Sequence, residues 1–185
     1  MKKLPFWIKV FSFFKTLEKL LDRCVLDVEN QLEERPEIVV YGKVCRQQRN
    51  VGFFARHSDN VSGYQYSGQI TTVIDLDEYP FLQQILDQVN AQLKANYNGI
   101  LVNLYENGNN YISAHSDDER SLANVGVASI AFGSTRTFRI RDKTTKKIII
   151  DHPHQAGDLL LMSGDFQKEF THEIPPQKRI TQIGR

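Results

Sequence analysis

The chain has 185 residues, 41% of them hydrophobic, and a formal net charge of +1. This length predicts one domain with a full hydrophobic core, and the composition excludes a largely disordered chain. A charge so close to zero excludes binding of polyanions through overall charge alone. Cationic residues nevertheless gather in two runs, 43–57 and 136–147. Each run either contacts phosphate groups or forms an ordinary solvated strand and loop surface.

The cysteines and the N-terminus bear on the compartment. Cys24 and Cys45 lie in unrelated contexts, which predicts neither a zinc site nor a disulfide framework and favours a reducing compartment. Pro5 and Lys9 interrupt the apolar N-terminus, and no small-residue cleavage site follows, so we expect no signal peptide. No stretch reaches the roughly 20 apolar residues of a membrane span. We expect an intracellular monomer, in the cytoplasm or the nucleus, with no membrane contact.

The first half of the chain mixes helical and extended patterns. Apolar residues recur at helical spacing over residues 11–33, which predicts an amphipathic helix. Residues 37–44 predict a short strand and a turn, and residues 63–68 alternate aromatic with small side chains. A second helix is predicted over residues 77–96, ended by the Asn-Gly pair at 98–99.

After this helix the pattern changes to short strands separated by turns rich in Gly, Asn and Asp. The predicted strands are 100–105, 111–114, 126–132, 137–141, 147–151, 158–162, 168–172 and one that starts at Arg179. Many short strands with such turns are typical of an antiparallel sandwich or jelly roll. We therefore predict an α+β protein with a β-sandwich core and N-terminal helices packed on one sheet.

Two histidines and one carboxylate are candidate metal ligands. His115 and Asp117 lie two residues apart at the end of a predicted strand, so both side chains point to the same face. His172 follows on a strand that we expect to form a hairpin with 158–162 and so return to the same mouth. Such a set holds one face of an octahedral metal and leaves three positions open, as in non-haem Fe(II) oxygenases. An HxD pair also occurs by chance in unrelated chains, so further motifs are needed.

Three more polar residues are candidates for an organic ligand. Asn103 and Tyr105 lie two apart on the strand before the HxD pair and face one way. The printed sequence ends at Arg185, and an arginine on a late strand suits the distal carboxylate of a dicarboxylate, because guanidinium makes bidentate hydrogen bonds. Two other histidines, His152 and His154, flank a proline and are interpreted as surface histidines of a loop.

As an ordered set, these motifs resemble the AlkB-type Fe(II)/2-oxoglutarate-dependent dioxygenases. The resemblance covers roughly residues 37–185 and is carried by N-x-Y, YENGNNYI, HSDDE, SIAFGSTRTF, GDLLLMSG, THEIPP and a late arginine. It implies a double-stranded β-helix, which is a jelly roll. The family's late arginine usually opens a strand that carries a second arginine further on. The printed sequence stops at Arg185, so we expect the C-terminal strand to be missing, and Arg179 is a weaker rival for the co-substrate arginine.

The resemblance also implies the cofactors and their ligands. It implies that His115, Asp117 and His172 hold Fe(II) and form the catalytic centre. Its co-substrates would be 2-oxoglutarate and O2. Contacts to 2-oxoglutarate are implied for Asn103, Tyr105 and Arg185.

Upstream, the match looks closest to the branch that repairs alkylated duplex DNA. The resemblance makes Tyr41, in VYGK, a candidate wedge that probes the base stack, and puts Arg46 in a nucleotide-recognition lid. An edge-strand aromatic is an equally good interpretation of Tyr41. We expect three segments within one structural domain: a helical segment over 1–36, the lid over 37–76, and a helix with the catalytic core over 77–185.

Four further residues are candidates for contact with the base. Tyr66 corresponds to a side chain that stacks on the flipped base, with Tyr64 beside it, and Asp118 to an acid that contacts the base edge. Glu119 is included with Asp118. The alternatives are ordinary alternating strand aromatics for the two tyrosines and a solvated turn for the two acids.

The favoured function is oxidative demethylation of N-alkylated nucleobases in DNA, of the 1-methyladenine and 3-methylcytosine type, with release of formaldehyde and succinate. One alternative keeps the chemistry but changes the substrate to RNA or protein. Another is a catalytically incomplete homologue that binds nucleic acid.

Overall fold

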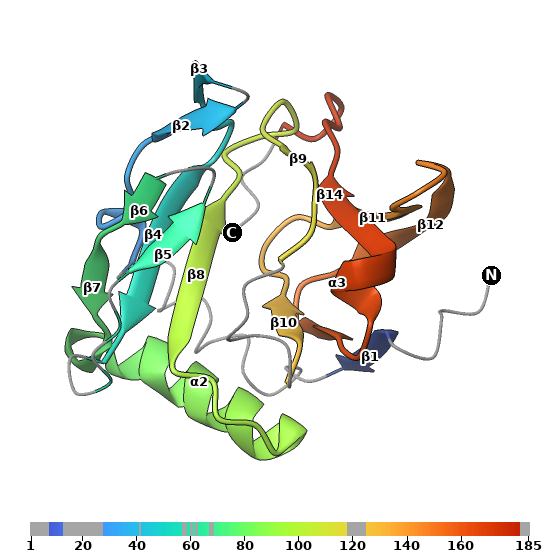
Figure 1. Cartoon of the computed structure of the whole chain (residues 1–185). Coiled ribbons are helices and arrows are strands. Elements are labelled where there is room, and N and C mark those ends of the chain that lie inside the picture. Colours follow the sequence, from blue (N-terminus) through green and yellow to red (C-terminus); the bar gives the residue numbers. More distant parts are fainter. Residues whose placement is uncertain are drawn as a thin grey trace. The chain divides into compact units, whose positions relative to one another are not determined.

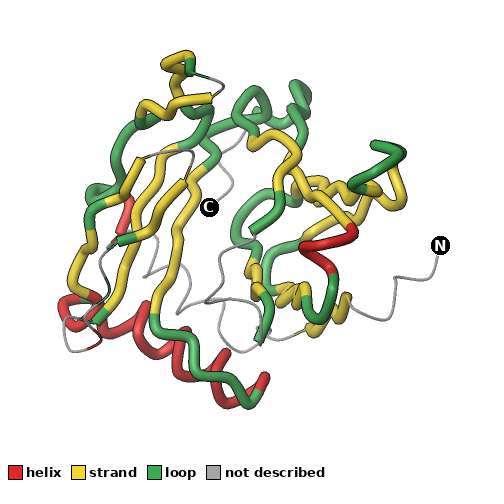
Figure 2. Tube along the Cα trace, in the orientation of Figure 1, coloured by secondary structure: helices red, strands yellow, loops and turns green. Residues whose placement is uncertain are grey.

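The structure is a computed structural model that describes residues 8–12, 28–40, 42–56, 59, 61, 63–66, 69–117 and 125–181. The chain divides into two compact units, one of Met1–Glu18 with Glu106–Arg185 and one of Lys19–Tyr105. The described part is mostly strand, and its helices are few (Figures 1 and 2).

The Lys19–Tyr105 unit is built around β4 (Asn50–Ala55), whose residues from Val51 onward are all buried. This strand lies between β7 (Val73–Asp75), which is parallel to it, and β8 (Gly99–Leu104), which is antiparallel. A near-continuous apolar run is what a central strand requires, because both of its faces are covered. Two hairpins accompany this sheet, β2 (Glu37–Val40) with β3 (Lys43–Arg46), and β5 (Tyr64–Tyr66) with β6 (Gln69–Thr71).

The predicted second helix is confirmed as a 3-10 turn, η2 (Leu76–Glu78), followed by α2 (Pro80–Leu93). At its start the Asp75 carboxylate accepts a hydrogen bond from the backbone N–H of Asp77 at 3.0 Å. Its apolar stripe is buried: Leu82, Ile85, Leu86 and Val89. The helix ends at Leu93 and is capped by Lys94, which has a φ of 52°, so it stops before the predicted Asn-Gly pair. Gly99 instead opens β8.

The other unit contains two antiparallel sheets. The first is β1 (Ile8–Ser12), β13 (Asp158–Met162) and β10 (Val127–Ile130), in that order. The second is β12 (Ile148–His154), β11 (Arg136–Asp142), β14 (Phe170–Ile174) and β9 (Ile112–His115). Both sheets and the short helix α3 (Phe166–Glu169) supply the buried core: Phe138, Ile140, Leu160, Met162, Phe166 and Phe170. This mostly-β arrangement agrees in coarse form with the predicted jelly roll.

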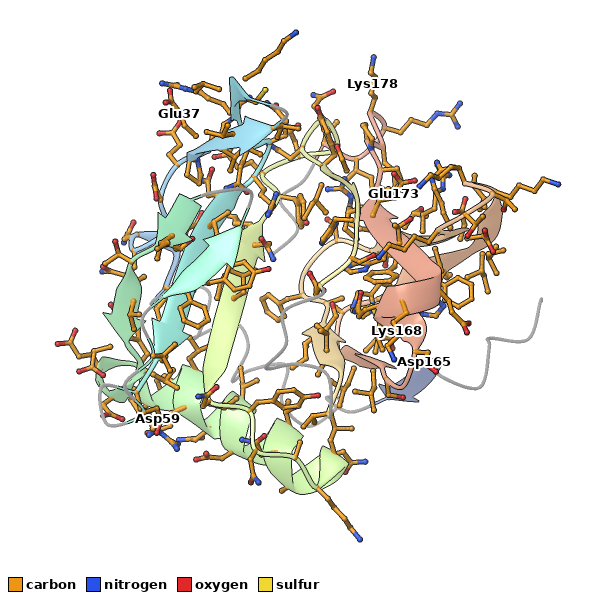
Figure 3. All side chains as sticks on the ribbon, in the orientation of Figure 1. Glu37, Asp59, Asp165, Lys168, Glu173 and Lys178 are labelled. Atoms are coloured by element: carbon orange, nitrogen blue, oxygen red, sulfur yellow. The ribbon has the colours of Figure 1, made fainter. Side chains whose placement is uncertain are left out.

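Alternation along β11 separates its two faces. Arg136, Phe138 and Ile140 are buried, whereas the arginines between and after them point outward. Arg139 Nε lies 2.7 Å from Asp151 Oδ1, and Arg141 Nη2 lies 2.8 Å from an oxygen of Glu173, which Figure 3 labels on β14. Most of the cationic run 136–147 is therefore engaged within the fold, which favours the interpretation as an ordinary strand surface.

Several predicted elements are wrong in part. The expected hairpin of 158–162 with the next strand does not form, because β13 and β14 belong to different sheets and the short helix α3 (Phe166–Glu169) carries the chain between them. The strand predicted at 168–172 accordingly starts later. Phe11 and Ser12, expected in a helix, belong to β1. Residues 13–27 lie outside the described residues, so the N-terminal helices are not confirmed. Arg179 lies in a turn.

Candidate metal centre

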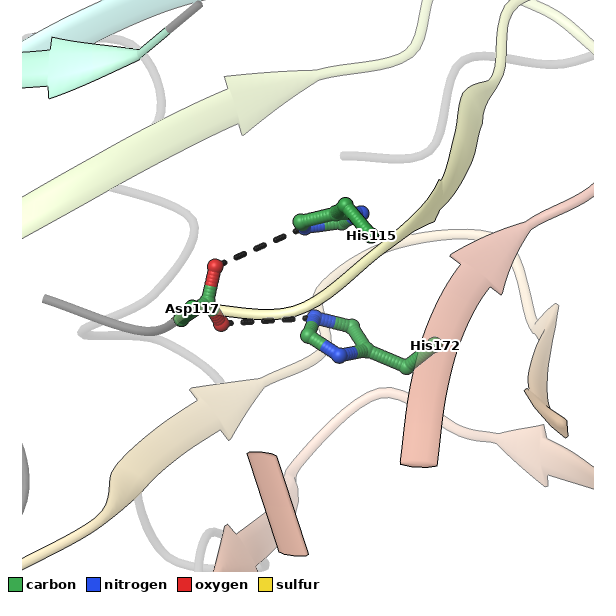
Figure 4. Close-up of side chains that lie close together, drawn as sticks. All are labelled: His115, Asp117 and His172. Atoms are coloured by element: carbon green, nitrogen blue, oxygen red, sulfur yellow. Dashed lines mark ion pairs between the residues drawn. The ribbon is translucent and has the colours of Figure 1, made fainter. Parts of the chain in front are cut away.

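Strand pairing brings the three predicted ligands together. His115 is the last residue of β9 and lies directly opposite His172 of β14 in the antiparallel register. Residues paired in this way have side chains on the same face of the sheet. Asp117 follows two residues after His115 and turns its carboxylate toward both rings (Figure 4).

The distances suit a shared ion. His115 Nε2 lies 3.5 Å from Asp117 Oδ1, and His172 Nε2 lies 3.4 Å from Asp117 Oδ2. The two imidazole rings have centroids 4.3 Å apart. Two imidazole nitrogens and one carboxylate on one side of an ion form the donor set of the 2-His-1-carboxylate site. All three predicted ligands therefore meet in one cluster.

A backbone contact fixes the orientation of one ring. His115 Nδ1 lies 2.8 Å from the carbonyl oxygen of Ser113, a distance at which a protonated Nδ1 donates to that oxygen. The lone pair is then on Nε2, which is the nitrogen that faces Asp117. Such a bond to the second ring nitrogen is the usual device that orients a metal-binding histidine.

The second ring is held by packing. His172 is 6% exposed and stacks on Phe138, with ring centroids 5.3 Å apart and an interplanar angle of 8°. Burial, and then the neighbouring His115, lowers the pKa of His172 well below its ordinary value. The imidazole is therefore neutral at pH 7, the state in which it ligates a metal.

The segment after β9 is tied to α3 and β14. Ser116 Oγ donates a hydrogen bond to the carbonyl of Phe170 at 3.0 Å, and the backbone N–H of Asp117 donates to Gln167 Oε1 at 3.0 Å. These two bonds determine where the carboxylate ligand lies relative to His172. Ligands on separate strands need such ties, because small displacements weaken a metal site.

Arg136 connects the approach to β9 with the segment after β14. It is 6% exposed, and its guanidinium donates to the carbonyls of Asn107, Asn110 and Pro175 and to Gln177 Oε1, at 2.8–3.3 Å. Gly108 lies in the same turn, and a Cβ at this position would clash with the backbone oxygen of Gln177. The YENGNN turn therefore needs glycine here. Backbone hydrogen bonds connect this glycine to Gln177 and Ile180 in the segment that follows β14.

Two candidate co-substrate residues belong to the other unit. Asn103 lies on β8 and Tyr105 directly follows that strand. The Asn103 side-chain oxygen accepts a hydrogen bond from Arg49 Nε at 2.6 Å, and Arg49 is 3% exposed. Arg185 lies outside the described residues.

The candidate substrate residues are only partly described. Arg46 is exposed on β3 and lies 3.6 Å from a carboxylate oxygen of Glu37. Tyr64 is half-buried on β5, and its ring packs on Phe53 at a centroid distance of 5.8 Å. Tyr66 belongs to β5, but its side chain is not among those described. Tyr41, Asp118 and Glu119 lie outside the described residues.

The chain matches the family described as the 2OG-Fe(II) oxygenase superfamily over residues 7–184. The chain belongs to this superfamily. The predicted cofactors, Fe(II), 2-oxoglutarate and O2, are those of the family, and the cluster of His115, Asp117 and His172 has the donor set that iron requires.

Similar proteins support the predicted resemblance to AlkB-type dioxygenases. The chain is 27% identical to "DNA oxidative demethylase ALKBH2" of Arabidopsis thaliana over 78% of its length and 53% of the relative. It is 29% identical to human ALKBH2 over 91% of its length and 63% of the relative. Human alkB homologue 3 is 33% identical over 62% of the chain and 43% of the relative. The chain thus spans about half the length of these relatives.

The solved structure of OsALKBH1 has a related fold. It superposes with a TM-score of 0.55 at 14% identity, covering 98% of this chain and 88% of that one. Among the described residues of this superfamily member, no helix is long and apolar enough to cross a membrane.

Two residues that support the cluster were missed from the sequence. Phe138 stacks on His172, and its place in the alternating RTFRI pattern already indicated an inward side chain. Gln167 holds the backbone of Asp117 from a four-residue helix, for which periodicity gives no signal.

Proposed function

We propose that this chain is an Fe(II)- and 2-oxoglutarate-dependent dioxygenase that oxidatively demethylates N-alkylated bases in DNA. The observation that carries the proposal is the convergence of His115 Nε2 and His172 Nε2 on the Asp117 carboxylate. Family membership and the relatives that are named DNA oxidative demethylases support the choice of reaction and substrate.

The reaction consumes O2 and 2-oxoglutarate. When bound, iron supplies oxidation in which 2-oxoglutarate loses CO2 to become succinate, one oxygen atom reaches the N-methyl carbon, and the resulting hemiaminal releases formaldehyde. His115, Asp117 and His172 would hold the ion on one face and leave the opposite face for the reactants. The buried ring of Phe138 covers one face of the His172 imidazole, which limits the access of water to that ligand.

We assign Asn103, Tyr105 and Arg185 to 2-oxoglutarate. Arg49 occupies the side-chain oxygen of Asn103, so the amide NH2 group is directed away from this contact and suits a carboxylate. Arg185 has the planar fork that binds a carboxylate through two parallel hydrogen bonds.

We assign the DNA contacts to Tyr41, Arg46, Tyr64, Tyr66, Asp118 and Glu119. Arg46 is exposed at the end of β3, and its pairing with Glu37 leaves both side chains mostly in solvent, where a phosphate can compete for the guanidinium. Tyr64 presents a half-buried ring that rests on Phe53, the kind of fixed aromatic platform on which a base stacks.

The test is an assay on synthetic oligonucleotides that contain 1-methyladenine or 3-methylcytosine, with Fe(II), 2-oxoglutarate and O2. We expect loss of 14 Da per lesion (about one CH2, the net change of an oxidation followed by formaldehyde release) together with formaldehyde and succinate. The matched variants are Asp117→Asn, which changes a ligand, and Asp151→Asn, which changes an outward carboxylate paired with Arg139. Demethylation that is equal in wild type and Asp117→Asn would overturn the proposal.

Strand form and substrate class are tested in the same assay. Duplex DNA, single-stranded DNA and RNA with the same lesion are compared for wild type and Tyr41→Ala. If Tyr41 probes the base stack, the variant loses activity on duplex DNA and keeps it on single strands. Succinate formation with methylated RNA or protein, and none with DNA, would favour the alternative substrates.

A further inference from the structure

A second group of two imidazoles and one carboxylate lies in the same unit as the first. His152, His154 and Asp158 each offer one donor atom, and these atoms all lie within 4.8 Å of one another. The sequence predicted surface histidines in a loop, which is wrong, because both histidines lie on β12 and His154 is 4% exposed.

The strand places both rings on one face. His152 and His154 are two residues apart, so their side chains point the same way. They lie opposite Phe138 and Arg136 of β11, whose side chains are buried. The turn after β12 then returns the chain to β13, which begins with Asp158. The arrangement is therefore local, built from one strand end and the turn that follows it.

The carboxylate is held in position by that turn. Asp158 Oδ2 accepts a hydrogen bond from the backbone N–H of Gln155 at 3.1 Å, and Gly157 adopts a φ of 83° between them. Only a residue without a Cβ adopts this backbone conformation readily. One carboxylate oxygen of Asp158 lies within 4.8 Å of a nitrogen of each histidine.

Two of the imidazole nitrogens are buried without a hydrogen-bond partner among the described residues, His152 Nε2 and His154 Nδ1. The other nitrogen of His154, Nε2, lies 3.3 Å from Ser129 Oγ. This contact orients the ring and leaves Nδ1 directed elsewhere. A buried polar atom without a partner is costly and rare in folded proteins, so each one calls for a ligand, a water or an ion.

We propose that His152, His154 and Asp158 form a second metal site, specific for a divalent first-row cation of the zinc type. Zinc is bound by imidazole nitrogen and carboxylate oxygen, commonly with three protein ligands and one open position. Calcium and magnesium prefer sites made entirely of oxygen donors, which this one is not. Nothing in the demethylation proposal requires such a site.

The two clusters are separate. Phe138 stacks on His172 of the first at a centroid distance of 5.3 Å and meets His154 of the second edge-on at 5.8 Å. The ring has no metal-binding atom, so neither cluster can share a ligand through it. An ion at the second site would join β12 of the four-stranded sheet to β13 of the three-stranded sheet.

The experiment counts zinc on the metal-stripped full chain by equilibrium dialysis and mass spectrometry. We expect two equivalents for wild type, because the first cluster also accepts zinc, and one equivalent for Asp158→Asn and for His154→Leu. Asp158→Asn keeps an oxygen for the Gln155 N–H, and circular dichroism reports whether each variant folds. The control is Asp151→Asn, which changes a carboxylate of β12 that is paired with Arg139. This variant should still bind two equivalents of zinc.

A thermal readout separates the two sites. In Asp117→Asn, zinc should still raise the unfolding temperature by several degrees, because a ligand that binds only the folded state stabilises it. That rise should vanish in the double variant with Asp158→Asn. A single zinc in wild type, or two in folded Asp158→Asn, would overturn the proposal. If His154→Leu does not fold, Asp158→Asn decides alone.

Discussion

The two histidine clusters have the same composition but are assembled in different ways. The first takes His115 and His172 from paired strands that are far apart in sequence and adds Asp117 from the segment after β9. The second takes His152 and His154 from one strand and Asp158 from the next, across a short turn. The first therefore depends on correct sheet assembly, whereas the second depends mainly on local backbone conformation.

The largest expected effect comes from changing the carboxylate of the first cluster alone. Asp117→Asn should lower demethylation more than about 100-fold, because even changes in the outer partners of metal ligands cost about 10–100-fold. Iron content and succinate production measure the effect, and Asp151→Asn serves as the control. If Asp117→Asn keeps full iron content, the first cluster is not the iron site.

Arg136→Ala should damage both clusters together. It removes the donors to three backbone carbonyls and one donor to Gln177 Oε1, and Arg136 lies opposite His154 in the β11–β12 register. We expect a loss of about 3–5 kcal/mol in the free energy of unfolding, because the carbonyls of Asn110 and Pro175 lose a charged donor, whereas Asn107 O and Gln177 Oε1 each keep a backbone N–H donor. Urea unfolding measures it, with Arg139→Ala on the outer face of the same strand as control. Equal losses in the two variants would contradict the role given to Arg136.

The second cluster should have a distinctive pH dependence in metal-free protein. Burial lowers the pKa of His154 to about 4, Asp158 opposes this shift and His152 adds to it. The unfolded state therefore takes up the proton first as the pH falls. The stability contribution is constant above about pH 6.5 and is lost between about pH 6.5 and 4, by about 3 kcal/mol.

His154→Leu should remove this part of the pH dependence. Urea unfolding from pH 7.5 down to 4.5, in the presence of a chelator, compares it with wild type. Identical slopes for the two proteins would show that His154 is not buried as a neutral base.

The smallest expected effect tests the ring between the clusters. Phe138→Leu keeps an apolar side chain, so we expect a loss of only about 1 kcal/mol in stability. Because Phe138 contacts His172 and His154, affinity for metal should fall modestly at both sites. Titration of each site in the variant measures this, and a fall at neither site would mean that the ring does not orient the ligands.

Sequence reasoning found the residues of the first cluster but not how they come together. The two-residue spacing of His115 and Asp117 predicted their common face, and strand periodicity identified most strands of the two antiparallel sheets. The partner of β14 was wrong, because pairing between distant strands leaves little trace in local pattern. The chain crosses from one sheet to the other through the short helix α3, for which periodicity gives no signal.

The second cluster was misread for a different reason. A proline between two histidines favours a loop, yet Pro153 lies within β12, beside β11 at the edge of its sheet. Proline has no N–H to donate, and an edge strand tolerates it because an N–H on the outward side of the strand would need no ladder partner. His154 contacts Phe138 from the same sheet and Ser129 from the other sheet. These contacts follow only from three-dimensional packing.

The outer charges of β11 have a consequence for the metal centre. Arg139 lies directly opposite Asp151 on one side and Glu173 on the other, so the ion pairs form only in one alignment of the three strands. A slip of one residue would turn every side chain of a strand to the other face. It would send His172 to solvent and Glu173 inward. The exterior ion pairs thus add to a strand alignment that is set mainly by the buried alternation of β11, the alignment in which His172 faces Asp117.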